Sequence, residues 1–234
     1  MAEKILEVDK IDTYYGLSHI LFGISLEVKK GEAVALLGRN GAGKTTTLKS
    51  IMGIVPPRSG SLKFRGDNIL GLRPHVIARK GLGYVPEDRR IFPFLTLQEN
   101  LEVAQKNIKG GWTIDKVFKL FPPLKMLQNS KGRHLSGGEQ QMLTIARTLV
   151  GNPELILMDE PSEGLAPVVI DDLTEQMLQL KKEGITMLVS EQNLSLATAI
   201  CDRAYIIENG QIRYQGSLDE LQENEAVMKN YLAV

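Results

Sequence analysis

Short apolar runs alternate along the chain with longer stretches in which apolar residues recur every three or four positions. Runs rich in Val, Ile and Leu predict β-strands, whereas the longer period predicts amphipathic helices. The predicted strands are KILEVD (4–9), ISLEV (24–28), AVALLG (33–38), SLKF (61–64), GLGYVP (81–86), LILMDE (155–160), TMLVSE (186–191), AYIIE (204–208) and QIRYQG (211–216). The predicted helices are 44–52, 139–150 and 169–182.

The predicted strands fall into two groups. Runs such as LILM and TMLVS are apolar throughout and alternate with helices, which is typical of a parallel sheet buried on both faces. The runs within 5–64 lie closer together and are separated by turns such as KKGE and PPRSG, which favours a small antiparallel layer. Residues 87–152 contain no evident strand and indicate a helical insertion. We therefore predict an α/β fold with a mostly parallel core sheet.

Composition narrows the class of protein. With 234 residues, the chain is long enough for one large α/β domain or one domain with a subdomain. Its 28 Lys and Arg residues balance 28 Asp and Glu residues, so net charge gives no case for nucleic-acid binding. The single cysteine, Cys201, excludes an internal disulfide. No apolar run approaches the roughly 20 residues that cross a bilayer, so we expect any membrane role to depend on a partner.

The stretch GRNGAGKTT at 38–46 carries the first candidate chemistry. Gly38, Gly43, Lys44 and Thr45 fit the phosphate-binding loop (P-loop) pattern G-x-x-x-x-G-K-[ST], between a predicted strand and a predicted helix. Glycines let backbone N–H groups curl around phosphates, Lys44 would reach the β- and γ-phosphates, and Thr45 would bind Mg²⁺. The predicted nucleotide-binding residues here are Gly38, Arg39, Asn40, Gly41, Ala42, Gly43, Lys44, Thr45 and Thr46.

A second candidate element is LILMDE, a buried strand that ends in two carboxylates. Ligands bind at the carboxyl ends of parallel strands, so we expect these carboxylates to face the P-loop. Asp159 is placed to hold Mg²⁺ through water, and Glu160 to act as general base on the attacking water. The two motifs together predict hydrolysis of a nucleoside triphosphate.

The sequence LSGGEQQ at 135–141 resembles the signature motif of ATP-binding cassette (ABC) ATPases. The resemblance implies that Ser136, Gly137, Gly138 and Glu139 bind the γ-phosphate of an ATP held by a second subunit. It also implies one ABC domain over 1–234, with a catalytic core and β subdomain at 1–86 and 153–234. Residues 87–152 would then form the helical subdomain. The plainer alternative is a loop in which Ser136 only caps the following helix.

Tyr15 matches the position at which the family has an aromatic residue that stacks on adenine. Tyr14 is an alternative for the same role, and a core or surface tyrosine with no ligand is a third interpretation.

Three positions depart from the usual pattern of the family. Glu87 replaces a Gln, Ala166 replaces an Asp, and Gln192 replaces a His. Glu87 can still offer oxygen to Mg²⁺, so the expected metal ligands are Thr45, Glu87 and Asp159. The expected catalytic residues are Lys44, Glu160 and Gln192. A degenerate, inactive site is the alternative, which the intact Lys44 and Glu160 disfavour.

These departures, with VPEDRRIFPFLTLQENL, EPSEGLAP and SEQN, resemble one of the two ATPase subunits of branched-chain amino acid importers. The resemblance implies a bacterial or archaeal subunit at the cytoplasmic face of the cell membrane. Its partners would be two transmembrane permease subunits, a second ATPase or a copy of itself, and indirectly an external substrate-binding protein. Alternatives are the same machinery for urea, amides or other amino acids, a soluble ABC ATPase without a transport role, and a regulatory cassette that does not hydrolyse ATP.

The loop RRIFPFLTLQENL offers apolar side chains next to Glu87. In one interpretation Ile91, Phe92, Phe94 and Leu95 contact the permease, with Arg89 and Arg90 as a polar rim. In the other they pack under the helical subdomain.

Overall fold

The computed structural model describes residues 3–232 and contains two β-sheets. The first, an antiparallel sheet, has the strand order β2-β1-β4-β5. Its strands are β1 (Lys4–Tyr15), β2 (Ser18–Lys29), β4 (Ser59–Phe64) and β5 (Asp67–Asn68). β1 and β2 are longer than predicted because they continue to a tight hairpin at residues 16–17, where Gly16 has a φ of 58°.

The second sheet has the order β10-β9-β3-β8-β7-β6 and is parallel except for the β9–β10 pair. Its strands are β3 (Ala33–Leu37), β6 (Leu82–Val85), β7 (Leu155–Asp159), β8 (Thr186–Glu191), β9 (Arg203–Glu208) and β10 (Gln211–Ser217). The expectation of one antiparallel layer over 5–64 was wrong for residues 33–37. All five residues of β3 are fully buried, which suits a central parallel strand rather than a half-exposed antiparallel one.

Helices cover the sheets and fill the region between β6 and β7. Two predicted helices begin two residues earlier than expected, one after the cap Ser136 and one at Pro167, because capping hydroxyls and N1 prolines set helix starts. The helical elements are α1 (Lys44–Ile51), α2 (Pro74–Arg79), α3 (Leu97–Glu102), α4 (Ile114–Leu120), α5 (Pro122–Met126), η1 (Gly132–His134), α6 (Gly137–Val150), α7 (Pro167–Lys182), α8 (Leu194–Ile200), α9 (Leu218–Glu223), α10 (Glu225–Val227) and η2 (Met228–Leu232).

The parallel sheet separates two hydrophobic cores. Along β3, Ala33, Ala35 and Leu37 face the core shared with α6, α7 and α8. Val34 and Leu36 face the core shared with α1 and the antiparallel sheet. Period-2 alternation therefore persists inside an all-apolar strand, with each face buried against a different layer.

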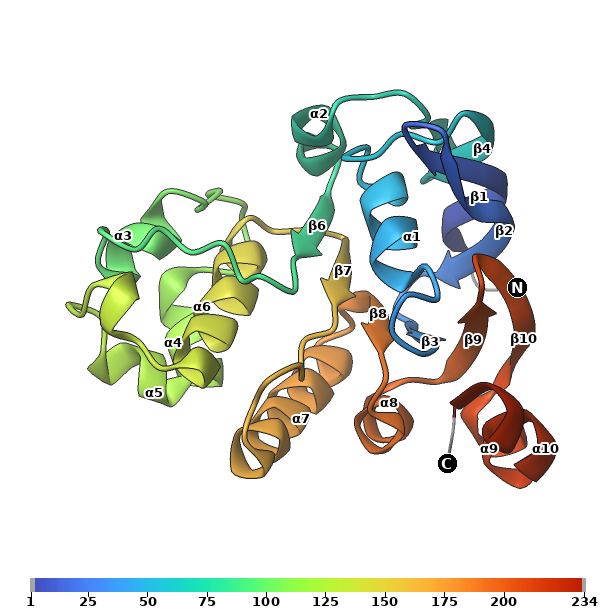
Figure 1. Cartoon of the computed structure of the whole chain (residues 1–234). Coiled ribbons are helices and arrows are strands. Elements are labelled where there is room, and N and C mark those ends of the chain that lie inside the picture. Colours follow the sequence, from blue (N-terminus) through green and yellow to red (C-terminus); the bar gives the residue numbers. More distant parts are fainter. Residues whose placement is uncertain (1–2, 233–234) are drawn as a thin grey trace.

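Helices α3 to α6 group together on one side of the molecule, away from the antiparallel sheet (Figure 1). α1 lies between the two sheets, and α7 and α8 cover the opposite face of the parallel sheet (Figure 1). Within residues 3–232, no helix combines the length and apolarity needed to span a bilayer.

Candidate active site

The loop from β3 to α1 has a backbone that only glycine fits at two positions. Gly43 has a φ of 115°, and a Cβ there would lie 2.9 Å from Leu21 Cδ2. A Cβ on Gly38 would lie 2.4 Å from the Ile207 carbonyl oxygen. The loop is therefore pressed against β2 and β9. The other predicted nucleotide-binding residues of this segment, Arg39, Asn40, Gly41, Ala42, Thr45 and Thr46, lie in the same loop and the first turn of α1.

The N-terminus of α1 is arranged to receive an anion. Gly43 occupies the N-cap position and provides no side-chain acceptor for the backbone N–H groups of the first turn. Lys44 begins the helix and is buried, with Nζ donating to the carbonyls of Gly38 at 2.7 Å and Arg39 at 3.1 Å. Backbone donors, the helix dipole and an ammonium group at one point are the chemistry that binds a phosphate chain.

Asp159, at the end of β7, is fully buried and accepts three hydroxyl hydrogen bonds. Thr45 Oγ1 donates to Oδ1 at 3.0 Å, Ser190 Oγ donates to Oδ1 at 2.9 Å, and Tyr84 OH donates to Oδ2 at 3.0 Å. Burial raises the pKa of Asp159, and the three donors oppose that rise. Thr45 and Asp159 were predicted to meet, whereas Tyr84 and Ser190 were missed.

Glu160 follows β7 in the left-handed region, with a φ of 45°. Its N–H donates to the Ser190 carbonyl at 3.0 Å, and it lies 3.1 Å from Ser190 Oγ. Its carboxylate lies 3.2 Å from Lys44 Nζ and accepts a 2.7 Å hydrogen bond from Gln192 Nε2. Gln192 Nε2 also donates to Asn40 Oδ1 at 2.7 Å. The structure thus brings Lys44, Glu160 and Gln192 together.

Hard oxygen donors dominate the environment of Asp159, and this donor set suits Mg²⁺. Burial, and then the negative charges of Glu160 and Asp159, raise the pKa of Glu87, so Glu87 lies within their field. Among residues 3–232, no group of three or more His, Cys, Asp and Glu side chains is arranged as a metal cage. A hydroxyl and a carboxylate that leave positions for phosphate and water fit the way Mg²⁺ binds in nucleotide sites.

The signature residues are held by local packing. Ser136 and Glu139 form a capping box at the start of α6, with Ser136 N donating to Glu139 Oε2 at 2.7 Å. A Cβ on Gly138 would lie 2.6 Å from Val169 Cγ1, and one on Gly137 would lie 2.9 Å from Arg89 Nη1. Within residues 3–232, no hydrogen bond or ion pair joins 136–139 to the P-loop. Their role toward a second subunit stays a prediction.

The structure separates Tyr14 from Tyr15. The Tyr14 ring stacks on His19 with centroids 4.0 Å apart, and the Arg58 guanidinium lies 4.1 Å from its centroid. Tyr15, at the end of β1, is 46% exposed. Because the Tyr14 ring already has neighbours, Tyr15 is the better candidate for stacking on a base.

The loop after Glu87 has both packed and exposed apolar side chains, and its contact with a permease stays a prediction. Ile91 packs against the core, whereas Phe92 is 44% exposed and Phe94 is 72% exposed. Asn100 holds the loop by accepting from Phe92 N at 2.8 Å and donating to Phe92 O at 3.0 Å. The Arg147 guanidinium lies 5.1 Å from the Phe92 ring centroid and also lines a cavity of about 300 Å³.

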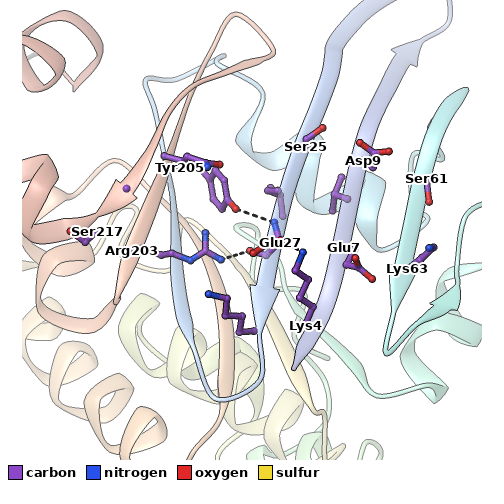
Figure 2. A pocket seen from close by; sticks show the side chains of 15 residues that line it. Lys4, Glu7, Asp9, Ser25, Glu27, Ser61, Lys63, Arg203, Tyr205 and Ser217 are labelled. Carbon is purple, nitrogen blue, oxygen red and sulfur yellow. Dashed lines mark hydrogen bonds and ion pairs between the residues drawn. The ribbon is translucent and has the colours of Figure 1, made fainter. Parts of the chain in front are cut away.

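A polar cavity of about 680 Å³ lies elsewhere, between the outer face of the antiparallel sheet and β9–β10 (Figure 2). Groups that line it bond to one another: Lys4 pairs with Glu27 at 2.6 Å, and the backbone N–H of Glu27 donates to Tyr205 OH at 3.1 Å. None of the predicted site residues lines it. It is therefore separate from the candidate active site.

Comparison with known proteins agrees with this geometry. The family described as ABC transporter matches residues 21–163. The high-affinity branched-chain amino acid transport ATP-binding protein BraG of Pseudomonas aeruginosa is 43% identical over 97% of this chain and 99% of its own length. The lipopolysaccharide export system ATP-binding protein LptB of Escherichia coli is 36% identical over 89% of each chain. The ADP conformation of MJ1267, an ATP-binding cassette of an ABC transporter, has a TM-score of 0.80 at 29% identity, covering 95% of this chain and 94% of that one.

Proposed function

Because this chain belongs to the ABC transporter family and is an ATPase, we propose that it powers the uptake of branched-chain amino acids through membrane permeases. The observation that carries the substrate class is the 43% identity to BraG over nearly the full length of both proteins. LptB, which serves lipopolysaccharide export, is less similar and covers less of the chain. No residue of an ATPase subunit need touch the transported molecule. The substrate class is therefore inferred from sequence similarity to a relative and not from the residues of the site.

The P-loop holds the phosphates of ATP in this proposal. Backbone N–H groups of the loop and the α1 N-terminus face the phosphates, and Lys44 moves from Glu160 to the β- and γ-phosphates. Thr45 and Asp159, already hydrogen-bonded, hold Mg²⁺ together with Glu87. A bound Mg²⁺ would neutralise charge that develops on the phosphate oxygens. Tyr15 stacks on the adenine.

Glu160 accepts the proton of the attacking water. Its position is set by the hydrogen bond from Gln192 and by the contact with Lys44. When Lys44 turns to the phosphates, Gln192 remains as the donor that orients the Glu160 carboxylate. The amide of Gln192 donates without taking up a proton, which distinguishes it from the usual His.

The working assembly is a head-to-tail dimer bound to permease subunits. Ser136, Gly137 and Gly138 of one subunit meet the γ-phosphate held by the other, either a second ATPase or a copy of this chain. The exposed Phe92, which lies under the Arg147 guanidinium, and the exposed Phe94 form the permease contact. We assign the chain to the cytoplasmic face of a bacterial or archaeal cell membrane, as a peripheral subunit.

The test is uptake of radiolabelled leucine, isoleucine and valine in cells that lack the gene, with and without a plasmid copy. The proposal expects uptake to be restored by the wild-type gene and not by Lys44→Ala. Restored transport of an unrelated substrate, with leucine uptake unchanged, would contradict the substrate class while leaving the ATPase assignment intact.

A further inference from the structure

The end of β8 contacts the end of β7 through three consecutive residues. Ser190 bonds to Asp159 and to the N–H of Glu160, and Gln192 bonds to the Glu160 carboxylate. Between them, Glu191 reaches past Glu160 to the backbone N–H of Ser162. Glu191 is the member of this tripeptide to which the proposed mechanism gives no role.

Both carboxylate oxygens of Glu191 are used as acceptors. Oε1 accepts from Ser162 N at 3.0 Å, and Oε2 accepts from Gln192 N and Asn193 N, each at 3.1 Å. The side chain belongs to a residue that is only 2% exposed. Glu191 therefore joins the turn after β7 to the turn after β8 through one buried group.

Burying a carboxylate is unfavourable unless hydrogen bonds compensate. Burial raises the pKa of Glu191, and the donors from Ser162, Asn193 and Gln192 oppose the rise. In the described chain, residues 3–232, no Lys, Arg or His lies within ion-pair distance of Glu191. An amide could replace the carboxylate only in part, because Gln has one oxygen acceptor where Glu has two.

The two bonds flank the strained residue of the active site. Glu160 N is fixed by Ser190, and two residues later Ser162 N is fixed by Glu191. A non-glycine residue keeps a left-handed conformation only where its surroundings determine it strongly. Glu191 supplies that constraint on the C-terminal side of Glu160.

We propose that Glu191 is a positioning residue that holds the turn carrying Glu160 in register with the turn carrying Gln192. It does so by accepting hydrogen bonds from backbone N–H groups of both turns, and it touches neither ATP nor water. This role rests on the proposed function, in which Glu160 is the base and Gln192 orients it. Glu191 acts on the rate of hydrolysis, and its own hydrogen bonds go to Ser162, Gln192 and Asn193 rather than to the P-loop.

The experiment compares Glu191→Gln, Glu191→Asp and the exposed control Glu183→Gln in the purified chain. Glu191→Gln is expected to lower kcat by about 10–100-fold, the scale of a misplaced catalytic group, with KM and the affinity for a fluorescent ATP analogue almost unchanged. Glu191→Asp keeps two acceptor oxygens and is expected to recover part of kcat. If Glu191→Gln does not fold, the change in kcat is compared with the change in KM for Glu191→Asp instead.

A double-mutant cycle with Gln192→Ala distinguishes positioning from general support of the fold. If Glu191 acts through Gln192 and Glu160, its substitution costs a smaller fold-change in kcat in the Gln192→Ala background than in the wild type. Equal fold-changes in both backgrounds, an unchanged kcat, or parallel loss of ATP affinity and melting temperature would each overturn the proposal. If Glu160→Gln and Gln192→Ala themselves leave kcat unchanged, the proposed mechanism fails instead.

Discussion

Lys44 Nζ lies 3.2 Å from Glu160 Oε1, so the P-loop lysine and the carboxylate after β7 form a buried ion pair. Removing one member of such a pair leaves the other charged, buried and unpaired. Each residue therefore affects both the fold and the chemistry. A variant at either position is therefore compared with a double variant that also neutralises the other residue, so that loss of stability can be told apart from loss of activity.

Lys44→Ala is expected to abolish ATP binding, because it removes the ammonium group that the P-loop carbonyls of Gly38 and Arg39 hold in place. It is also expected to destabilise the chain by about 3–5 kcal/mol, since Glu160 is left unpaired. Calorimetric ATP titration and thermal melting measure the two effects. The double variant Lys44→Ala/Glu160→Gln should regain stability but not binding, and recovery of binding would contradict the role of Lys44.

Glu160→Gln is expected to bind ATP and to hydrolyse it at least about 10²-fold more slowly, because the amide is not a base. Lys44 contacts Oε1 of Glu160 and Gln192 donates to Oε2, so the single amide oxygen of the variant keeps only one of these two contacts. Steady-state phosphate release measures the rate. Gel filtration should show an ATP-dependent dimer that persists, and undiminished phosphate release would exclude Glu160 as the base.

Tyr15→Ala is expected to weaken ATP affinity about tenfold, the scale of one lost base–aromatic stack. Tyr14→Ala is the matched control, because its ring is occupied by His19 and Arg58. Fluorescence titration with an ATP analogue compares the two. A larger loss of affinity for Tyr14→Ala would move the adenine contact to Tyr14.

Glu87→Gln is expected to raise the melting temperature at neutral pH, measured in EDTA without nucleotide. Burial and the charges of Glu160 and Asp159 raise the pKa of Glu87, so its ionised form destabilises the folded state. That penalty is complete above the raised pKa and disappears as pH falls through the unfolded value of about 4.3. The stabilisation should therefore vanish at low pH. A gain that is equal at pH 4 and pH 7.5 would contradict electrostatic repulsion as its cause.

Phe94→Asp is expected to uncouple transport from ATP hydrolysis, because Phe94 is 72% exposed in the loop assigned to the permease. Met126→Asp is the control, since Met126 is 84% exposed on the same group of helices but outside that loop. Transport and ATPase activity are measured in reconstituted vesicles. Equal effects of the two substitutions would place the permease contact elsewhere.

The sequence predicted those features of the site that lie in contiguous motifs. The P-loop and the strand before Asp159 are recognisable because buried runs and glycine spacing are local properties. Two partners of Asp159, Tyr84 and Ser190, were not predicted, because they come from neighbouring strands and a hydroxyl leaves no periodic signal. Strand pairing alone brings these residues together.

The same limit explains the wrong assignment of residues 33–37. Proximity along the chain to β1, β2 and β4 suggested one antiparallel layer. Residues 33–37 are instead completely buried and form a central strand of the parallel sheet. The early helix starts at 137 and 167 follow from the cap Ser136 and from Pro167, both of which are visible in the sequence.

The position of β3 between β8 and β9 also bears on how the chain is synthesised. β1, β2 and β4 can pair as soon as residue 64 has emerged from the ribosome, but β3 has no neighbour in its own sheet until residues 186–208 follow. At about 5–20 residues per second, that delay is roughly 10–30 s. A fully apolar strand lacks its sheet partners for that time, and unpaired apolar strands make a nascent chain prone to aggregate.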